Sequence, residues 1–138
     1  MIPILGVNSN LKNGLHIPML EFDDVNLRCL FAEIKNLQDR FRLGQAVIVS
    51  TGRFDSYHVF FKNQVTWKNA IKICAESELY DLKHLQFSLK RGHFTLRLSS
   101  KGGRKNELVD IIESDYASNC EFSDFDSFVL YETAVRIG

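Results

Sequence analysis

Two apolar periodicities alternate along the chain, and their order limits the fold more than any other feature of the sequence. Apolar residues recur at steps of three and four over residues 26–43, which is typical of an amphipathic helix. Short apolar or β-branched runs lie on either side of it, at residues 15–23, Ala46–Ser50 and Tyr57–Phe61, and they are typical of strands. Helical periodicity returns after Thr66. This order predicts an α+β protein whose helices pack on a sheet.

The N-terminal region predicts a β-hairpin. An Asn-Gly pair within residues 11–14 separates two apolar segments, residues 2–8 and 15–23. Asn-Gly between such segments is the strongest short hairpin signal, because both residues tolerate positive φ. We therefore expect these two segments to pair as antiparallel strands.

Capping residues and glycines predict where the helices begin and end. Asp24 or Asn26 is the expected N-cap of the first helix, and Gly44 is its expected end. A third, shorter helix is expected within residues 80–91 and would stop at Gly92.

The C-terminal part predicts further strands. Residues 94–99 alternate between apolar and polar side chains, which is typical of a strand. The Gly-Gly pair at 102–103 marks a turn, and residues 108–112 are the expected hairpin partner of the preceding strand. Residues 128–137 are expected to form a last strand. The whole pattern predicts an antiparallel or mixed β-sheet with helices packed on it, of the ferredoxin-like or RNA-recognition type.

Composition narrows the class of protein. A chain of 138 residues with 45% hydrophobic content is expected to form a single globular domain. The formal net charge is zero, so any nucleic-acid binding needs a local basic patch. Three cysteines without a CxxC pair argue against a disulfide framework and against structural zinc. With no signal peptide and no apolar run near 18 residues, we expect a cytoplasmic protein without a membrane segment.

Two carboxylates end the second predicted strand. Glu21 and Asp23 are two residues apart, so in a strand their side chains project from the same face. Like charges this close repel each other, and a divalent cation removes that repulsion and creates a site for phosphate oxygens. The alternative is that both are solvated charges where the strand runs into solvent.

A histidine opens a later apolar strand. His58 follows a loop rich in hydroxyl groups that contains Arg53 and Ser56. Such a loop can present backbone N–H groups and a guanidinium to phosphate oxygens. A half-buried histidine that is hydrogen-bonded within the core is the alternative interpretation.

In this combination the chain resembles the catalytic core of the archaeo-eukaryotic primase superfamily, which includes primase-polymerases encoded by plasmids, viruses and repair systems. In that family an acidic-x-acidic pair binds the catalytic metals, and Glu21 and Asp23 match it. A Ser-x-His strand holds the phosphates of the incoming nucleotide, and Ser56 and His58 match it. The resemblance covers roughly residues 15–101 and implies a minimal catalytic core.

The family's third motif is a single acidic residue upstream of a strand that carries a basic group. Asp81 is the best candidate, since it precedes the 94–99 strand with Arg97, and Asp110 is the runner-up. The alternative role for Asp81 is the N-cap of the short helix that follows it.

The basic residues are concentrated near that strand. Six cations and no acidic residue occur among the sixteen residues from 90 to 105, including Arg97 and Lys101. Such a strip attracts phosphate, although lysines also keep a solvated hairpin edge from aggregating.

The resemblance implies a metal-dependent nucleotidyltransferase that binds nucleoside triphosphates and single-stranded or primed DNA, with Mg²⁺ or Mn²⁺ as cofactor and a helicase or other replication protein as a partner. Its host process would be replication or repair, including that of a mobile element. A non-catalytic nucleic-acid-binding module or a pure interaction subunit on the same type of fold remains the alternative. The residues implied are Glu21, Asp23 and His58 for catalysis, Ser56, His58, Arg53, Arg97 and Lys101 for nucleotide phosphates, and Glu21, Asp23 and Asp81 for metal.

Overall fold

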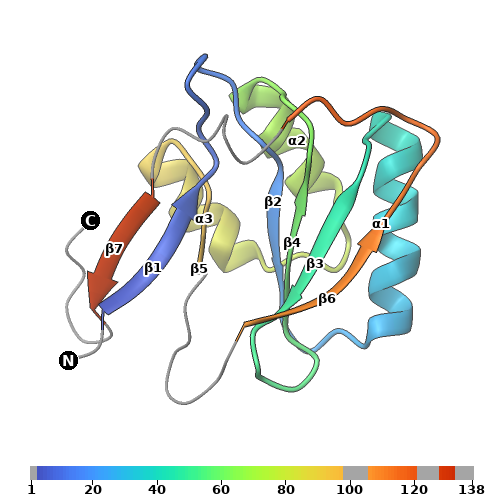
Figure 1. Cartoon of the computed structure of the whole chain (residues 1–138), viewed down its shortest axis with the longest axis horizontal. Helices are drawn as coiled ribbons and strands as arrows, with labels where there is room; N and C mark the ends of the chain where they lie inside the picture. Colours follow the sequence, from blue (N-terminus) through green and yellow to red (C-terminus); the bar gives the residue numbers. More distant parts are fainter. Residues whose placement is uncertain (1–2, 98–105, 121–127, 133–138) are drawn as a thin grey trace.

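Two antiparallel sheets and three helices make up the computed structural model, which describes residues 3–97, 106–120 and 128–132 (Figure 1). The larger sheet has the order β2-β4-β3-β6 and the smaller one β5-β1-β7. The strands are β1 (Pro3–Asn8), β2 (Met19–Phe22), β3 (Ala46–Ser50), β4 (Tyr57–Phe61), β5 (Thr95–Arg97), β6 (Glu107–Ile112) and β7 (Phe128–Glu132). The helices are α1 (Leu27–Phe41), α2 (Trp67–Glu76) and α3 (Leu82–Arg91). The α+β class predicted from the sequence is confirmed.

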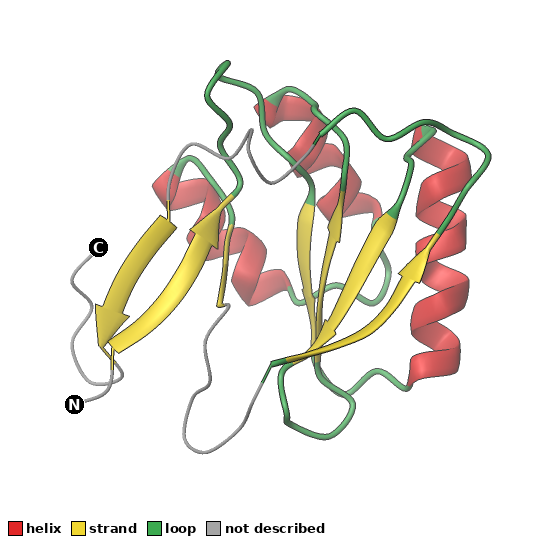
Figure 2. Ribbon diagram, in the orientation of Figure 1, coloured by secondary structure: helices red, strands yellow, loops and turns green. Residues whose placement is uncertain are grey.

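Strand β2 is buried except at Glu21. Leu20 and Phe22 are fully buried in the hydrophobic core, whereas Glu21 between them is half-buried. Figure 2 shows α1 and α2 on the same side of the four-stranded sheet. The apolar stripe of α1 is buried in the same core as Leu20 and Phe22. The helices therefore cover one face of the sheet, and Glu21 lies on the other.

The predicted N-terminal hairpin forms only next to its turn, where Asn10 and His16 make an antiparallel bridge and the N–H of Ile17 donates to the carbonyl of Ser9 at 3.0 Å. The turn at residues 11–14 forms, and the N–H of Gly14 donates to the carbonyl of Leu11 at 3.0 Å. However, β1 pairs with β5 and β7, while β2 pairs with β4. Beyond the turn, His16 and Val65 exchange two backbone hydrogen bonds of 2.8 Å. This non-local pairing carries the chain away from β1 and into the second sheet.

The predicted pairing across the Gly-Gly turn is wrong for the residues that the structure describes. Strand β5 pairs with β1, where Arg97 lies opposite Gly6, and β6 pairs with β3, where Leu108 lies opposite Val49. The turn itself, at 102–103, lies outside the described residues. A turn signal predicts that the chain reverses, but it does not specify which strand becomes the neighbour.

The last strand begins where the sequence pattern predicts it. Strand β7 pairs with β1 and begins at Phe128 as expected, and the rest of the expected range after Glu132 lies outside the described residues. Among the described residues, none of the helices combines the length and the apolar character needed to cross a membrane.

The caps of α1 are partly as predicted. Asn26 is the N-cap, and its side chain accepts a hydrogen bond from the N–H of Cys29 at 2.9 Å. The helix ends earlier than expected, because Arg42 adopts the left-handed conformation with φ 54° and closes the helix. Gly44 is therefore not the C-cap. Its N–H donates to Asn63 Oδ1 at 2.8 Å.

The reason for glycine at position 44 is space, and this gives a stability prediction. A Cβ at Gly44 would lie 2.6 Å from Ser118 Oγ and 2.7 Å from the backbone nitrogen of Ser118. Gly44→Ala should therefore destabilise the protein by about 1–3 kcal/mol, the usual cost of overpacking. Urea unfolding measures the difference. A variant as stable as the wild type would mean that the 114–119 segment is not held against Gly44.

Candidate metal centre

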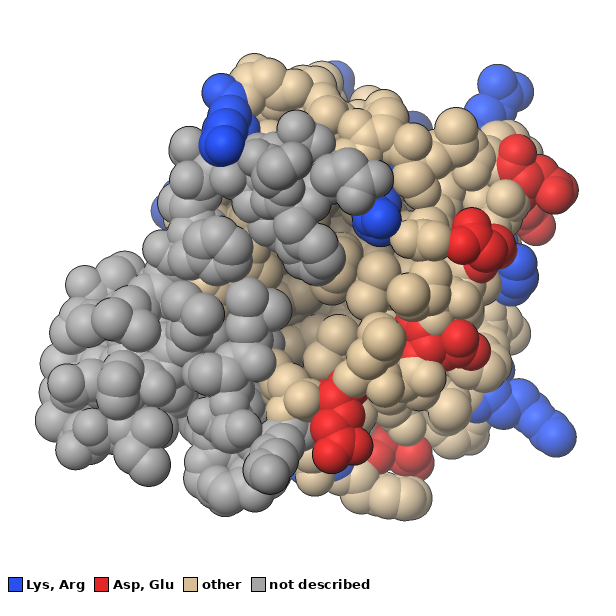
Figure 3. Space-filling model, in the orientation of Figure 1, with Lys and Arg blue, Asp and Glu red and all other residues tan. Residues whose placement is uncertain are grey.

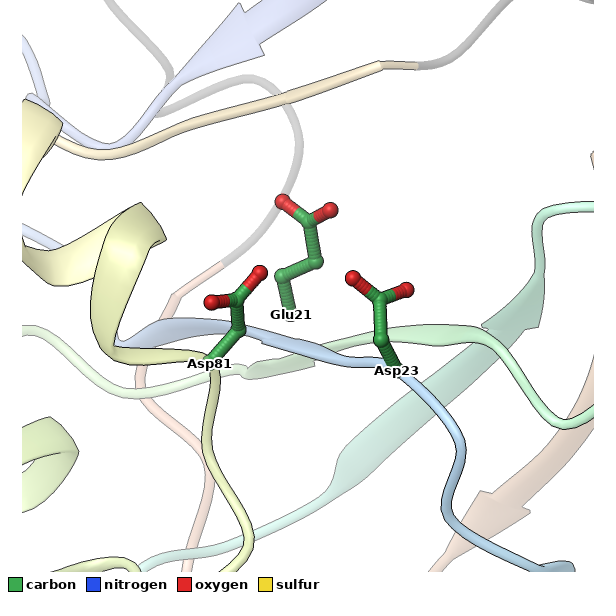
Figure 4. Close-up of side chains that lie close together, drawn as sticks. All are labelled: Glu21, Asp23 and Asp81. Carbon is green, nitrogen blue, oxygen red and sulfur yellow. The ribbon is translucent and has the colours of Figure 1, made fainter.

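Three carboxylates converge beside the end of β2. Glu21 lies in β2, Asp23 follows two residues later, and Asp81 immediately precedes α3. One ligand oxygen from each side chain lies within 4.8 Å of the other two, and Figure 4 shows the three carboxyl groups gathered above the strand. Oxygens that share one Mg²⁺ at its ordinary bond length are about 3–4 Å apart, so small side-chain rotations would complete the site. The donor set, all carboxylate oxygen, fits Mg²⁺ or Mn²⁺.

Backbone hydrogen bonding places Asp81 next to the acidic pair. The N–H of Asp81 donates to the carbonyl of Glu21 at 3.0 Å, which attaches the start of α3 to the edge of β2. The side chain of Asp81 also caps α3 by accepting from the N–H of Lys83 at 2.9 Å. Both roles weighed for Asp81 are therefore compatible, because one carboxylate oxygen can cap the helix while the other faces the acidic pair.

A buried tyrosine and a half-buried histidine adjoin the acidic cluster. The hydroxyl of Tyr80 is hydrogen-bonded to Nδ1 of His84, and Nε2 of His84 is 3.0 Å from the carbonyl of Thr95. Since a carbonyl can only accept, Nε2 carries the proton and Nδ1 accepts from the tyrosine. This chain of contacts connects α3 to β5.

Burial decides the charge state of this pair. Burial lowers the pKa of His84, and this outweighs the opposite effects of the Thr95 carbonyl and of the carboxylates of Asp81 and Asp23. Burial also raises the pKa of Tyr80, and the Cys74 thiol and the charge of Glu21 raise it further. Both side chains are therefore neutral near pH 7 and add no positive charge to the cluster.

Sequence reasoning missed a buried carboxylate that supports the cluster. Glu33 in α1 is only 8% exposed and accepts from Ser77 Oγ at 2.9 Å and from the N–H of Leu79 at 3.1 Å. These bonds hold the α2–α3 connection that leads to Asp81. The signal was present in the sequence, because Glu33 lies three residues after Leu30 on the apolar stripe of α1.

His58 lies on the same sheet face as Glu21. The two residues are direct partners in the antiparallel pairing of β2 with β4, and side chains at such positions project from the same face. His58 is buried, with 6% exposure. Its assignment to phosphate binding stays a prediction.

The loop before β4 is a closed turn. Ser56 is 1% exposed, its N–H donates to the carbonyl of Arg53 at 3.2 Å, and its hydroxyl lies 3.5 Å from the carbonyl of Phe54. Arg53 is exposed. Ser56 therefore holds the turn together, and Arg53 is the side chain of this pair that a ligand in solvent can reach.

The remaining predicted site residues either lie away from the carboxylate cluster or fall outside the part of the chain that the structure describes. Asp110 lies in β6, three strands across the sheet from β2, and accepts from the N–H of Ile111 at 2.8 Å. Asp81, not Asp110, thus completes the group of acids among the described residues. Arg97 lies in β5, and its side chain lies outside the described part, as does Lys101 entirely.

The arrangement is chemically suited to a divalent cation. Three half-buried carboxylates from two separate elements can share one ion and leave coordination positions for water or phosphate oxygens.

No family model matches the chain, and comparison with curated proteins and with solved structures gives no match either.

Proposed function

We propose that this protein is a metal-dependent nucleotidyltransferase of the primase-polymerase type, which binds a nucleoside triphosphate and single-stranded or primed DNA in replication or repair. The observation that carries the proposal is the convergence of Glu21, Asp23 and Asp81 within 4.8 Å. Glu21 and Asp23 correspond to the acidic pair of that family, and Asp81 corresponds to its third acidic motif. Their order along the chain and their closeness support this function over a solvated strand end.

The proposed chemistry assigns a task to each side chain. Bound Mg²⁺ or Mn²⁺ would lower the pKa of a 3′-hydroxyl and neutralise charge on the triphosphate. Glu21, Asp23 and Asp81 hold the ion, while Arg53 and His58 bind and orient the phosphates from the neighbouring loop and strand. The buried Ser56 holds the turn that carries Arg53. Arg97 and Lys101 supply further positive charge for phosphate.

The sheet supports an RNA-recognition-like core as part of this proposal. The helices cover the face of β2 that carries Leu20 and Phe22, and Glu21 lies on the opposite face beside the buried His58. The half-buried carboxylates of the metal centre are the part of that face that a substrate reaches. A replication partner such as a helicase and a host process in a mobile element belong to the same proposal.

Replacement of Asp81 tests whether Mn²⁺ binds at the three carboxylates or only responds to the overall negative charge of the surface. Asp81→Asn should weaken Mn²⁺ binding by about tenfold or more, because it removes one of three converging ligands. Asp110→Asn makes the same change of charge on β6 and should leave the affinity within about twofold, as expected for a solvated charge. Titration calorimetry or the electron paramagnetic resonance signal of free Mn²⁺ measures both. Equal effects of the two variants would contradict the proposal.

A further inference from the structure

The loop between β3 and β4 displays an aromatic side chain to solvent. Phe54 is 86% exposed, more than any other large hydrophobic residue in the described part of the chain; Leu82 follows with 63%. Arg53 beside it is exposed as well. A large apolar ring held almost entirely in water calls for a physical reason.

The backbone of this loop is held in place on both sides of Phe54. The N–H of Thr51 donates to the carbonyl of Ser56 at 3.2 Å, and the N–H of Ser56 donates to the carbonyl of Arg53 at 3.2 Å. The N–H of Val25 donates to the carbonyl of Asp55 at 3.0 Å and attaches the loop to the segment after β2. Phe54 is therefore presented at the corner of an ordered turn.

Asp55 takes the left-handed conformation that this turn needs. Its φ is 51°, and aspartate is one of the few residues besides glycine that adopt this region, because its short polar side chain can hydrogen-bond locally. This conformation and the hydrogen bonds on both sides fix the backbone next to Phe54.

The loop lies at the same end of the sheet as the metal centre. Val25, which bonds to the loop, is two residues after Asp23, and Figure 1 shows the β3–β4 loop extending past the end of β2. The β6 side of the sheet is acidic, since it carries Glu107, Asp110 and Glu113, and acidic side chains gather along that side in Figure 3. Phosphate is repelled there, whereas the loop carries one cation, Arg53, and one acid, Asp55. A nucleic-acid strand that reaches the metal centre is therefore repelled less along the loop than along β6.

We propose that Phe54 stacks on an unpaired nucleobase of single-stranded nucleic acid, with Arg53 at an adjoining phosphate, so that the loop holds a strand beside the metal centre. The inference deepens the proposed function and rests on it for the identity of the strand as template or primer. Base–aromatic stacking accepts any base, and a neighbouring arginine tracks the backbone charge.

The surroundings of Phe54 favour a base over a protein or membrane. Its neighbours in the loop, residues 51–53 and 55–56, are all polar or glycine. The hot spot of a protein interface is enclosed by further packed residues, and a membrane anchor needs an extended apolar face. The ring lies between Arg53 and Asp55 in the sequence, and a nucleotide can stack its base on the ring while its phosphate contacts the guanidinium.

The test is fluorescence anisotropy with a labelled twelve-nucleotide oligothymidylate, in EDTA so that metal binding does not contribute. Phe54→Ala and Phe54→Leu should each weaken binding by about fivefold or more, and Phe54→Trp should retain the affinity, because stacking needs an aromatic face. Phe87→Ala is the matched control, since Phe87 is also exposed, at 58%, but lies on α3. Arg53→Ala should reduce the slope of log affinity against log salt by about one.

An abasic oligonucleotide of the same length completes the experiment. The wild type should bind it as weakly as Phe54→Ala binds oligothymidylate. Equal binding of oligothymidylate by the wild type and by Phe54→Ala, or equal wild-type binding of the abasic and normal strands, would overturn the inference, and Phe54 would then be a contact for another protein. Binding in EDTA that depends on Phe54, in a protein that incorporates no nucleotide, would refute the enzyme and leave the stacking site standing. Binding of Mn²⁺ that depends on Asp81, without binding of oligothymidylate, would refute the stacking site and leave the metal centre standing.

Discussion

Replacing both Glu21 and Asp23 with alanine should abolish nucleotide incorporation and leave the free energy of unfolding in metal-free buffer unchanged or slightly raised. The substitution removes two of the three converging carboxylates, and Asp81 alone would hold Mg²⁺ too weakly to support catalysis. Removing two of the like charges also relieves repulsion within the cluster, as is common where stability has been traded for function. Primer extension and urea unfolding measure the two effects.

Asp24→Asn is the matched control for this double variant. Asp24 is next to Asp23 but exposed, with φ 56°, and asparagine tolerates that left-handed conformation. Its incorporation rate should stay close to that of the wild type. If Glu21 and Asp23 have only a structural role, the double variant would lose about 1 kcal/mol or more of stability and the wild type would incorporate nothing.

Truncation of Phe22 should give the largest loss of stability, about 3–5 kcal/mol for Phe22→Ala. The side chain is fully buried, and its ring centroid lies 6.2 Å from that of Tyr80 in an edge-to-face contact. A loss of that size is a large part of the stability of an ordinary domain. Because Phe22 lies between Glu21 and Asp23, and Tyr80 directly precedes Asp81, Mn²⁺ affinity should fall with it.

Two control variants test whether the loss of stability comes from the buried packing of Phe22 or from removing any phenylalanine. Phe22→Leu keeps most of the buried volume and should cost less than about 1.5 kcal/mol. Phe54→Ala removes the same side chain from an exposed position and should change stability by less than about 0.5 kcal/mol. Urea unfolding of the three proteins decides the matter. A loss below 1 kcal/mol for Phe22→Ala would contradict the packing of β2 on the α2–α3 connection.

Local signals predicted the elements well because they act within a few residues. The three- and four-residue steps located α1, the short apolar runs located β3 and β4, and Asn26 was correctly placed among the candidate caps. The strand partners were not predictable in this way. Residues 11–14 form a turn as the Asn-Gly pair predicts, yet the bonds between His16 and Val65 decide where the next strand goes.

The candidate site was predictable to a similar extent. The spacing of Glu21 and Asp23 follows from strand geometry alone, but the choice between Asp81 and Asp110 depends on which segment lies beside β2. The hydrogen bond from Asp81 to Glu21 makes that choice, and it joins residues 60 positions apart. Glu33 was missed because the sequence does not show which groups would pair with a carboxylate on the apolar stripe of α1. Its partners, Ser77 and Leu79, lie more than 40 residues away in the α2–α3 connection.

The most direct test of the metal centre is a crystal structure of the protein with MnCl₂ and a non-hydrolysable nucleoside triphosphate. Anomalous scattering identifies Mn²⁺ independently of any assumption about its ligands. We expect a Mn²⁺ ion bound by oxygens of Glu21, Asp23 and Asp81 at about 2.0–2.3 Å, with a phosphate oxygen of the nucleotide completing its coordination. Triphosphate and Mn²⁺ bound elsewhere on the protein, with the three carboxylates turned apart into solvent, would contradict the account.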